Sequence, residues 1–95
     1  MVTETDHPHI VQNSEILSGE PVIRGTRTPV RAIVEMWRLG IPVEEIPNRL
    51  PYLKLGQVFG ALSYFSDHQA EIMHHIERNR VDESLIHPAA KNQSE

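Results

Sequence analysis

The chain contains no cysteine, which excludes disulfide bonds and metal sites with thiolate ligands. It also has no apolar run near the roughly 20 residues that a membrane-spanning helix needs. Residues 1–6 are polar and acidic, which is unlike a signal peptide. We therefore expect a cytoplasmic protein without a membrane partner. The 95 residues, 39% of them hydrophobic, are enough for one small domain with a modest core.

An overall excess of positive charge is also missing, because the formal net charge is −4. This charge argues against a protein that coats nucleic acid without specificity. The charges are unevenly distributed, however. Cationic side chains outnumber acidic ones in residues 21–54, whereas the segments on either side are acidic. Such a basic segment can contact phosphate or an acidic protein surface, or it can be a solvated surface of mixed sign.

Residue combinations that support catalysis or metal binding are scarce. Catalysis needs a nucleophile beside a base, or converging carboxylates in a cleft, and neither Ser18 nor Ser63 has an evident base. The chain has six histidines, but no pair has the i, i+4 spacing of a zinc-binding helix. We therefore expect no enzyme activity, no metal and no other cofactor. A ligand or metal sensor that uses the helical face of His68 and His75 is an alternative.

The N-terminal quarter shows weak strand signals. Residues 1–8 are expected to be disordered. Short apolar runs at residues 9–12, 16–17 and 22–23 follow, and Gly19 and Pro21 mark a turn between the last two. This pattern predicts a small β-hairpin. A hairpin of this size is unstable alone, so it must pack on helices or on a partner strand.

The first helix is predicted to open at Thr28-Pro29 and to end at Gly40. Threonine is a good N-cap, proline is well tolerated in the first turn, and glycine commonly ends a helix in a left-handed conformation. The predicted core face has i, i+3, i+4, i+7 spacing and consists of Val30, Ile33, Val34 and Trp37. A second, short helix is expected around residues 43–50, where Pro47 requires either a kink or a single loose turn.

The third helix is predicted to start near Leu55, and a fourth is expected over roughly residues 68–80 with Asp67 as its cap. The apolar face of the third helix is predicted to contain Leu55, Val58, Phe59 and Leu62. In the fourth, Ile72 and Ile76 are one turn apart and form a narrow packing edge. Residues 81–95 are expected to be a flexible tail.

The two short helices within residues 43–66 are joined by about four residues, which predicts a helix-turn-helix. The second helix of such a motif enters the major groove of DNA, so Lys54, Gln57 and Tyr64 are the predicted groove-facing residues. No arginine projects from this helix to read guanine. Gly56 and Gly60 form a smooth strip for close approach by DNA, by a second copy or by another helix of the same chain.

The segment from Arg24 to Arg27 reads Arg-Gly-Thr-Arg and directly precedes the first helix. Backbone amides, hydroxyls and guanidinium groups at a helix N-terminus make a good anion site. The anion could be a DNA phosphate or an acidic residue of a partner, and we assign Arg24, Arg27 and Arg31 as phosphate contacts. The alternative is that Arg24 or Arg27 pairs with an acidic residue of the same chain: Glu20, Glu44 or Glu45.

The Pro-Val-Ile-Arg-Gly-Thr-Arg stretch that follows Gly19-Glu20 resembles the bacterial and archaeal family known as domain of unknown function 433. Further motifs of that family match Gly40, Val43-Glu44-Glu45-Ile46, Pro51-Tyr52-Leu53 and Ala61-Leu62-Ser63-Tyr64. The similarity covers roughly residues 9–76. It implies a mainly α fold, a homeodomain-like helix-turn-helix bundle with a small N-terminal β-hairpin, as a single domain over residues 9–80.

The resemblance implies an antitoxin-like regulator that binds and neutralises a PIN-like nuclease toxin, with promoter DNA as a second partner. A homodimer would match a two-fold operator, and the N-terminal strands offer an edge for pairing. In the tail, Leu85 and Ile86 are the predicted anchors for the partner. The alternative function is a protein-interaction module with a helix-turn-helix fold that no longer binds DNA.

Overall fold

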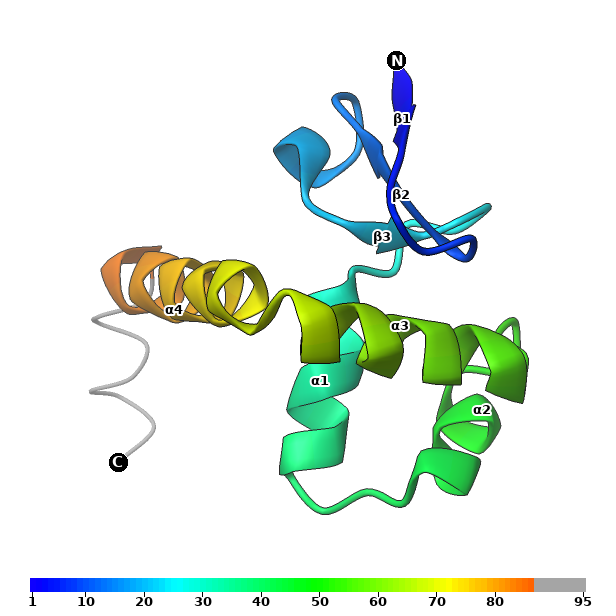
Figure 1. Ribbon diagram of the computed structural model, residues 1–95. Helices are drawn as coiled ribbons and strands as arrows, with labels where there is room; N and C mark the ends of the chain where they lie inside the picture. The colour runs from blue at the N-terminus through cyan, green and yellow to red at the C-terminus, as the bar shows by residue number, and fades with distance from the viewer. Residues whose placement is uncertain (87–95) are drawn as a thin grey trace.

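A small antiparallel sheet lies against one side of a helical array in the computed structural model (Figure 1). The structure describes the backbone of residues 1–86 and the side chains of residues 1–80. The strands are β1 (Val2–Glu4), β2 (Ile10–Asn13) and β3 (Val22–Ile23), in the spatial order β1-β2-β3. The helices are α1 (Val30–Arg38), α2 (Ile46–Arg49), α3 (Leu55–Asp67) and α4 (Gln69–Ile86). The fold is therefore mainly α with an N-terminal strand element, as predicted.

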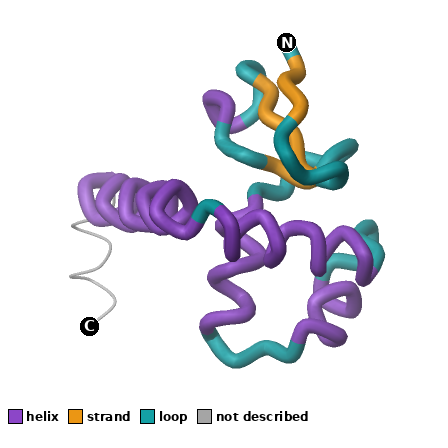
Figure 2. The backbone as a smooth tube through the Cα atoms, viewed as in Figure 1, coloured by secondary structure: helices purple, strands orange, loops and turns teal. Residues whose placement is uncertain are grey.

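The predicted hairpin gains a third strand. β2 pairs with β3 through Ile10 opposite Ile23, and β1 pairs with the other edge of β2 through Thr3 opposite Gln12. The prediction that residues 1–8 are disordered is wrong, because β1 hydrogen-bonds to β2 and Thr5 Oγ1 donates to the Ile10 carbonyl at 2.6 Å. Figure 2 shows the three strands together at the N-terminal end of the tube.

The connection between β2 and β3 also differs from the prediction. Residues 16–17 were expected to extend a strand, but Leu17–Gly19 form one 3₁₀ turn. Leu17 and Ser18 have φ values of 50° and 56°, the left-handed region that non-glycine residues seldom adopt. This turn brings Glu20 back to the start of β3, where its side chain is buried.

Helix α1 ends as predicted, because Gly40 has φ +93° and its N–H donates to the Trp37 carbonyl. Its start differs: the N-cap position is Pro29, without a side-chain cap, and the Thr28 hydroxyl instead contacts the Tyr52 hydroxyl. Val30, Ile33 and Val34 are buried as expected. The assignment of Trp37 to the core is wrong, because its side chain is 45% exposed and packs edge-on against Phe65.

The second helical segment is a 3₁₀ turn (η2, Val43–Glu45) that runs into the single turn of α2. Pro47 lies in the first turn of α2, where its missing N–H breaks no helical hydrogen bond. Of the two predicted alternatives, a kinked helix or a single loose turn, the structure has short turns and no continuous kinked helix. Ile46 is fully buried and anchors this turn to the core.

Helix α3 begins at the predicted residue but presents a different face to the core. Val58, Ala61 and Tyr64 are its buried side chains, whereas Leu55 and Phe59 are exposed. α3 packs across α1, and its Gly60 faces the β2 end of the sheet. A Cβ atom on Gly60 would lie 3.0 Å from His9 Cβ, so this glycine serves close packing within the chain.

Helix α4 buries Ile72 and Ile76, as predicted. Its first turn starts from His68, whose carbonyl accepts from the Ile72 N–H, so the prediction of Asp67 as the cap is wrong. The helix continues past residue 80 to Ile86 and overlaps the predicted tail, 81–95. Residues 87–95, and the side chains of the predicted anchors Leu85 and Ile86, lie outside the described residues.

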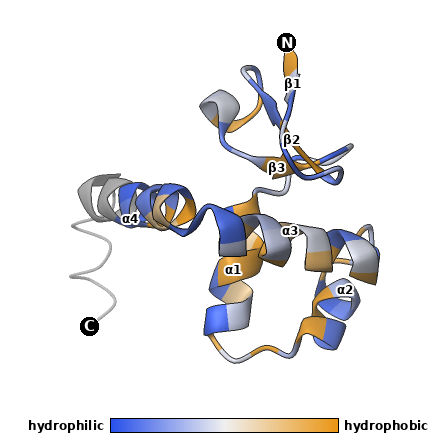
Figure 3. Cartoon of the chain, in the orientation of Figure 1, coloured by the Kyte–Doolittle hydropathy of each residue, from blue (hydrophilic) through white to orange (hydrophobic). Residues whose placement is uncertain are grey.

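One hydrophobic core joins the sheet to the helices. Ile10 and Ile23 from the sheet meet Ile33 of α1 and Ile72 of α4 within a single buried cluster. Figure 3 shows hydrophobic residues on β3 and on α1, with hydrophilic stretches along α4. No helix within residues 1–86 has the length and apolar character needed to cross a membrane.

Candidate functional site

Two of the predicted DNA contacts point into the protein. The Arg31 guanidinium pairs with Glu20, with Nε 2.7 Å from Oε2, and also lies 3.7 Å from Glu35. Tyr64 is 3% exposed, and its hydroxyl donates to Glu71 Oε1 at 2.7 Å. Burial and the nearby Glu71 carboxylate raise the pKa of Tyr64. The prediction that Tyr64 faces a groove is therefore wrong, and Arg31 is engaged in an internal ion pair.

Arg24 and Gln57 are at the surface but have partners within the chain. The Arg24 guanidinium pairs with Glu4 and donates to the Pro8 carbonyl at 3.0 Å. Arg24 therefore forms an internal ion pair, but the predicted partners Glu20, Glu44 and Glu45 are wrong, because the partner is Glu4. The hydrogen bond from Arg24 lowers the pKa of Glu4. Gln57 Oε1 accepts from the Lys54 backbone N–H at 2.7 Å and so caps α3.

The remaining predicted cations, Arg27 and Lys54, are exposed, and neither forms an ion pair with any residue of the described part of the chain. Arg27 follows a sharp turn at Gly25, whose φ is +80°. Together with Tyr52, these two residues line a shallow hollow at the start of α1. Of the six predicted DNA contacts, only Arg27 and Lys54 present to solvent a charge that no described residue pairs.

An open, largely apolar groove continues from this hollow between α1 and the turn that precedes α3. Leu39 is 81% exposed and Tyr52 is 58% exposed, and with the neighbouring apolar side chains they form a contiguous surface. The groove is lined mainly by apolar side chains together with two charged ones, and its residues are Arg27, Thr28, Pro29, Ala32, Glu35, Met36, Leu39, Leu50 and Tyr52. The groove therefore combines an apolar floor with one cation, Arg27, and one anion, Glu35. Sequence reasoning missed it, because these residues come from three separate segments.

The outer face of α3 is also apolar rather than basic. Leu55 and Phe59 are 39% and 53% exposed, and no atom lies within 4 Å of a Cβ built on Gly56. The predicted recognition helix therefore exposes hydrophobic side chains where a DNA-reading helix would carry polar ones. This surface is better suited to protein than to base edges.

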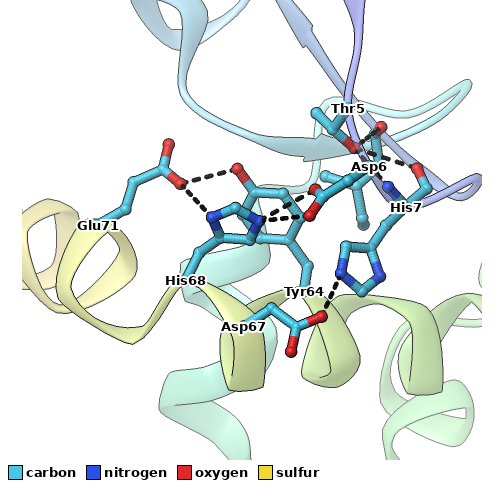
Figure 4. Close-up of polar contacts among 8 residues, drawn as sticks. Thr5, Asp6, His7, Tyr64, Asp67, His68 and Glu71 are labelled. Carbon is cyan, nitrogen blue, oxygen red and sulfur yellow. Dashed lines mark hydrogen bonds and ion pairs between the residues drawn. The ribbon is translucent and has the colours of Figure 1, made fainter.

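A polar cluster joins the β1–β2 loop to the junction of α3 and α4 (Figure 4). His7 Nε2 lies 2.9 Å from Asp67 Oδ2, and His68 Nε2 lies 3.0 Å from both carboxylate oxygens of Asp6. The hydrogen bond with His68 lowers the pKa of Asp6. The His68 ring stacks on Tyr64 with centroids 4.2 Å apart. We call Asp6, His7, Asp67 and His68 the junction cluster.

Sequence reasoning did not find the junction cluster. The search for metal ligands considered histidines at helical spacing, whereas these pairs join residues 60 and 62 positions apart. His7 and Asp6 also lay in a segment that was expected to be disordered. The predicted combination of His68 and His75 is not what the structure brings together: His75 lines a separate hollow with Glu20 and Arg78.

Comparison with known proteins gives a family but no activity. Residues 10–65, more than half of the chain, match the model of a family described as Protein of unknown function (DUF433). A search of curated proteins finds no match. The chain is also similar to a solved structure, described as the crystal structure of a DUF433 member protein from Anabaena variabilis ATCC 29413 at 2.00 Å resolution. The two share 26% identity over 73% of this chain and 68% of the other, with a TM-score of 0.68.

Proposed function

Because the chain belongs to the DUF433 family of proteins of unknown function, we propose its role from its surface: it is an antitoxin-type module that binds and neutralises a PIN-like nuclease. The observation that carries the proposal is the apolar groove between α1 and the turn before α3. Contiguous exposed apolar surface commonly marks a protein-binding site. The resemblance of the Pro-Val-Ile-Arg-Gly-Thr-Arg segment supplies the class of partner.

The groove has the features of a binding site for an apolar segment of a partner, with charged groups at Arg27 and Glu35. Leu39 and Tyr52 provide exposed apolar area, and the Tyr52 ring is oriented by the contact of its hydroxyl with Thr28. A tyrosine held in place loses little conformational freedom on binding, which is why such residues often dominate interface energetics. Arg27 at the rim can pair with a carboxylate of the partner.

The first experiment is affinity purification of the tagged chain from its own host. We expect a PIN-like protein to co-purify in stoichiometric amount, and purification without such a protein would contradict the proposal. The second experiment compares Leu39→Asp with Phe59→Asp in the purified pair. Both residues are exposed, but only Leu39 lines the groove. We expect Leu39→Asp to abolish binding and Phe59→Asp to preserve it. The reverse pattern would move the interface to α3.

Promoter DNA is the second candidate partner, bound by a cytoplasmic homodimer through the turn between α2 and α3. Exposed Arg27 and Lys54 support this candidate, and the solvent-facing strand β1 offers an edge for pairing two copies. The inward orientation of Arg31 and Tyr64 favours the alternative, a module with the same fold that does not bind DNA. With or without DNA binding, we propose a protein that catalyses no reaction and requires no cofactor.

Salt dependence separates these two forms. If Arg24 and Arg27 contact phosphate, the Arg24→Ala/Arg27→Ala variant binds promoter DNA more weakly, and its affinity falls less steeply with salt concentration. Arg38→Ala is the matched control, since Arg38 is an exposed arginine at the opposite end of α1. An unchanged salt slope in the double variant would exclude these residues as phosphate contacts. If the native protein shows no salt-sensitive retention on DNA, then the module binds protein but not DNA.

A further inference from the structure

The junction cluster places three potential metal ligands around one point. One ligand atom each from Asp6, His7 and His68 lie within 4.8 Å of one another, and Asp6 and His68 are already at 3.0 Å. Around a zinc ion with bonds of about 2.0–2.2 Å, neighbouring ligand atoms are roughly 3–3.5 Å apart. Only a small side-chain movement, chiefly of His7, separates the observed arrangement from that geometry.

We propose that Asp6, His7 and His68 form a binding site for a divalent transition metal of the Zn²⁺ class. Imidazole nitrogen suits zinc and its neighbours in the transition series, whereas Ca²⁺ and Mg²⁺ prefer a shell of oxygen ligands. Three protein ligands from two histidines and a carboxylate leave a fourth position for water or a partner side chain. The site is independent of the proposed nuclease partner, because it lies at the junction of the sheet and α3–α4, not in the groove.

The surroundings of His68 suit coordination through Nε2. This nitrogen faces Asp6, and on the other side of the ring Nδ1 lies 3.8 Å from Glu71 Oε1. A neutral histidine that binds metal through Nε2 carries its proton on Nδ1, and a carboxylate near that nitrogen stabilises this tautomer. Glu71 is itself fixed by the hydrogen bond from Tyr64, and the Tyr64 ring holds the His68 ring by stacking.

Charge at the junction also favours a dication. His7 Nε2 lies 2.9 Å from Asp67 Oδ2, so Asp67 adds a second carboxylate beside Asp6. A metal ion held by Asp6 and His68 takes the place of their direct hydrogen bond, and the carboxylates of Asp6 and Asp67 offset the charge of the ion. Side chains of His7 and His68 are 13% and 32% exposed, so the ion would be partly shielded from water yet reachable from it.

The test is calorimetric titration of ZnCl₂ into the full chain without a histidine tag, together with thermal unfolding at increasing Zn²⁺. We expect one Zn²⁺ per chain and a Tm that rises with Zn²⁺ concentration, because an ion that binds only the folded state stabilises it. His68→Ala and His7→Ala should each weaken binding at least tenfold. His74→Ala is the control, because His74 is an exposed histidine of α4 outside the junction cluster. This variant should bind Zn²⁺ with unchanged affinity.

Two further measurements distinguish loss of the metal site from unfolding of the variant. Glu71→Gln leaves all three ligands in place and should weaken binding about tenfold, the effect expected of a residue that orients a ligand. Co²⁺ substitution should give a visible absorption spectrum typical of nitrogen and oxygen ligands in the native protein and in His74→Ala, but not in folded His68→Ala. No Zn²⁺ binding by the native chain, or equal affinity in native protein and His68→Ala, would overturn the proposal.

Discussion

Arg31 of α1 pairs with Glu20 of the β2–β3 connection, and the two side chains are 17% and 6% exposed. The contact joins the sheet to the first helix from residues eleven positions apart. Nε and Oε2 are 2.7 Å apart but are not aligned as a hydrogen bond, so charge attraction accounts for the pairing. Removing one partner leaves the other charge buried and poorly compensated, which is a large destabilising effect.

Glu20→Gln should therefore lower the free energy of unfolding by about 3 kcal/mol, as expected when a buried ion pair loses one charge. Urea unfolding monitored by circular dichroism measures the change. Glu35→Gln is the control, because Glu35 lies 3.7 Å from the same guanidinium but is more exposed. That substitution should cost less than about 0.5 kcal/mol. Equal effects of the two variants would show that burial of the Glu20 pair is unimportant.

The two glycines of α3 should respond in opposite ways to substitution by alanine. Gly56→Ala should stabilise the protein by up to about 0.5 kcal/mol, because alanine is the better helix former and its Cβ meets open space, although the first turn is less sensitive than the helix interior. Gly60→Ala should destabilise it, because the new Cβ would lie 3.0 Å from His9 Cβ. Thermal unfolding of the two variants side by side is the measurement. A stabilised Gly60→Ala variant would mean that the sheet moves away at little cost.

Gly40 offers a test of backbone strain without a steric component. Its φ is +93°, yet no atom lies within 4 Å of the position that a Cβ would occupy here. Gly40→Ala should therefore cost about 1–2 kcal/mol from the left-handed conformation alone. Gly40→Asn should recover part of this loss, because asparagine tolerates that conformation better. Chemical denaturation measures both, and an unaffected Gly40→Ala variant would contradict the assigned conformation.

The hydroxyl contact between Thr28 and Tyr52 holds the start of α1 against the turn before α3. Tyr52→Phe removes this contact and leaves the buried Thr28 hydroxyl without its side-chain partner, so stability should fall by about 1 kcal/mol. Tyr52→Phe retains the ring but not the contact that orients it, so this variant should bind the proposed partner more weakly than native protein and more tightly than Tyr52→Ala. Tyr52→Ala should lose both stability and binding. Equal binding by all three proteins would remove Tyr52 from the proposed interface.

Much of the helical layout could be predicted from sequence because its signals are local. Gly40 ended α1 as expected, Pro47 confined α2 to a single turn, and Ile72 and Ile76 faced the core. Helix α3 could not be oriented in the same way. It carries apolar residues around much of its circumference, so the series through Leu55 and the series through Ala61 both have helical spacing. Packing against α1 and the sheet decides between them.

The parts that sequence reasoning missed depend on contacts between distant positions. Nothing in residues 1–8 indicates a strand, because β1 owes its order to pairing with β2. In the same way, Glu4 could not be predicted as the partner of Arg24, because only the pairing of β1 with β2 places it there. Arg31 and Tyr64 were wrongly predicted as DNA contacts for a related reason. Helical spacing alone does not show which polar side chains have partners within the chain.

The junction cluster has a consequence for how the protein folds. Its two pairs close loops of 60 and 62 residues, and the loss of chain entropy on closure grows with loop length. Helix α1 and the α3–α4 pair can form from contacts much nearer in sequence, so we expect the N-terminal sheet to dock late. By the same reasoning, amide hydrogens of β1 should exchange with solvent through a local opening that leaves the helices intact.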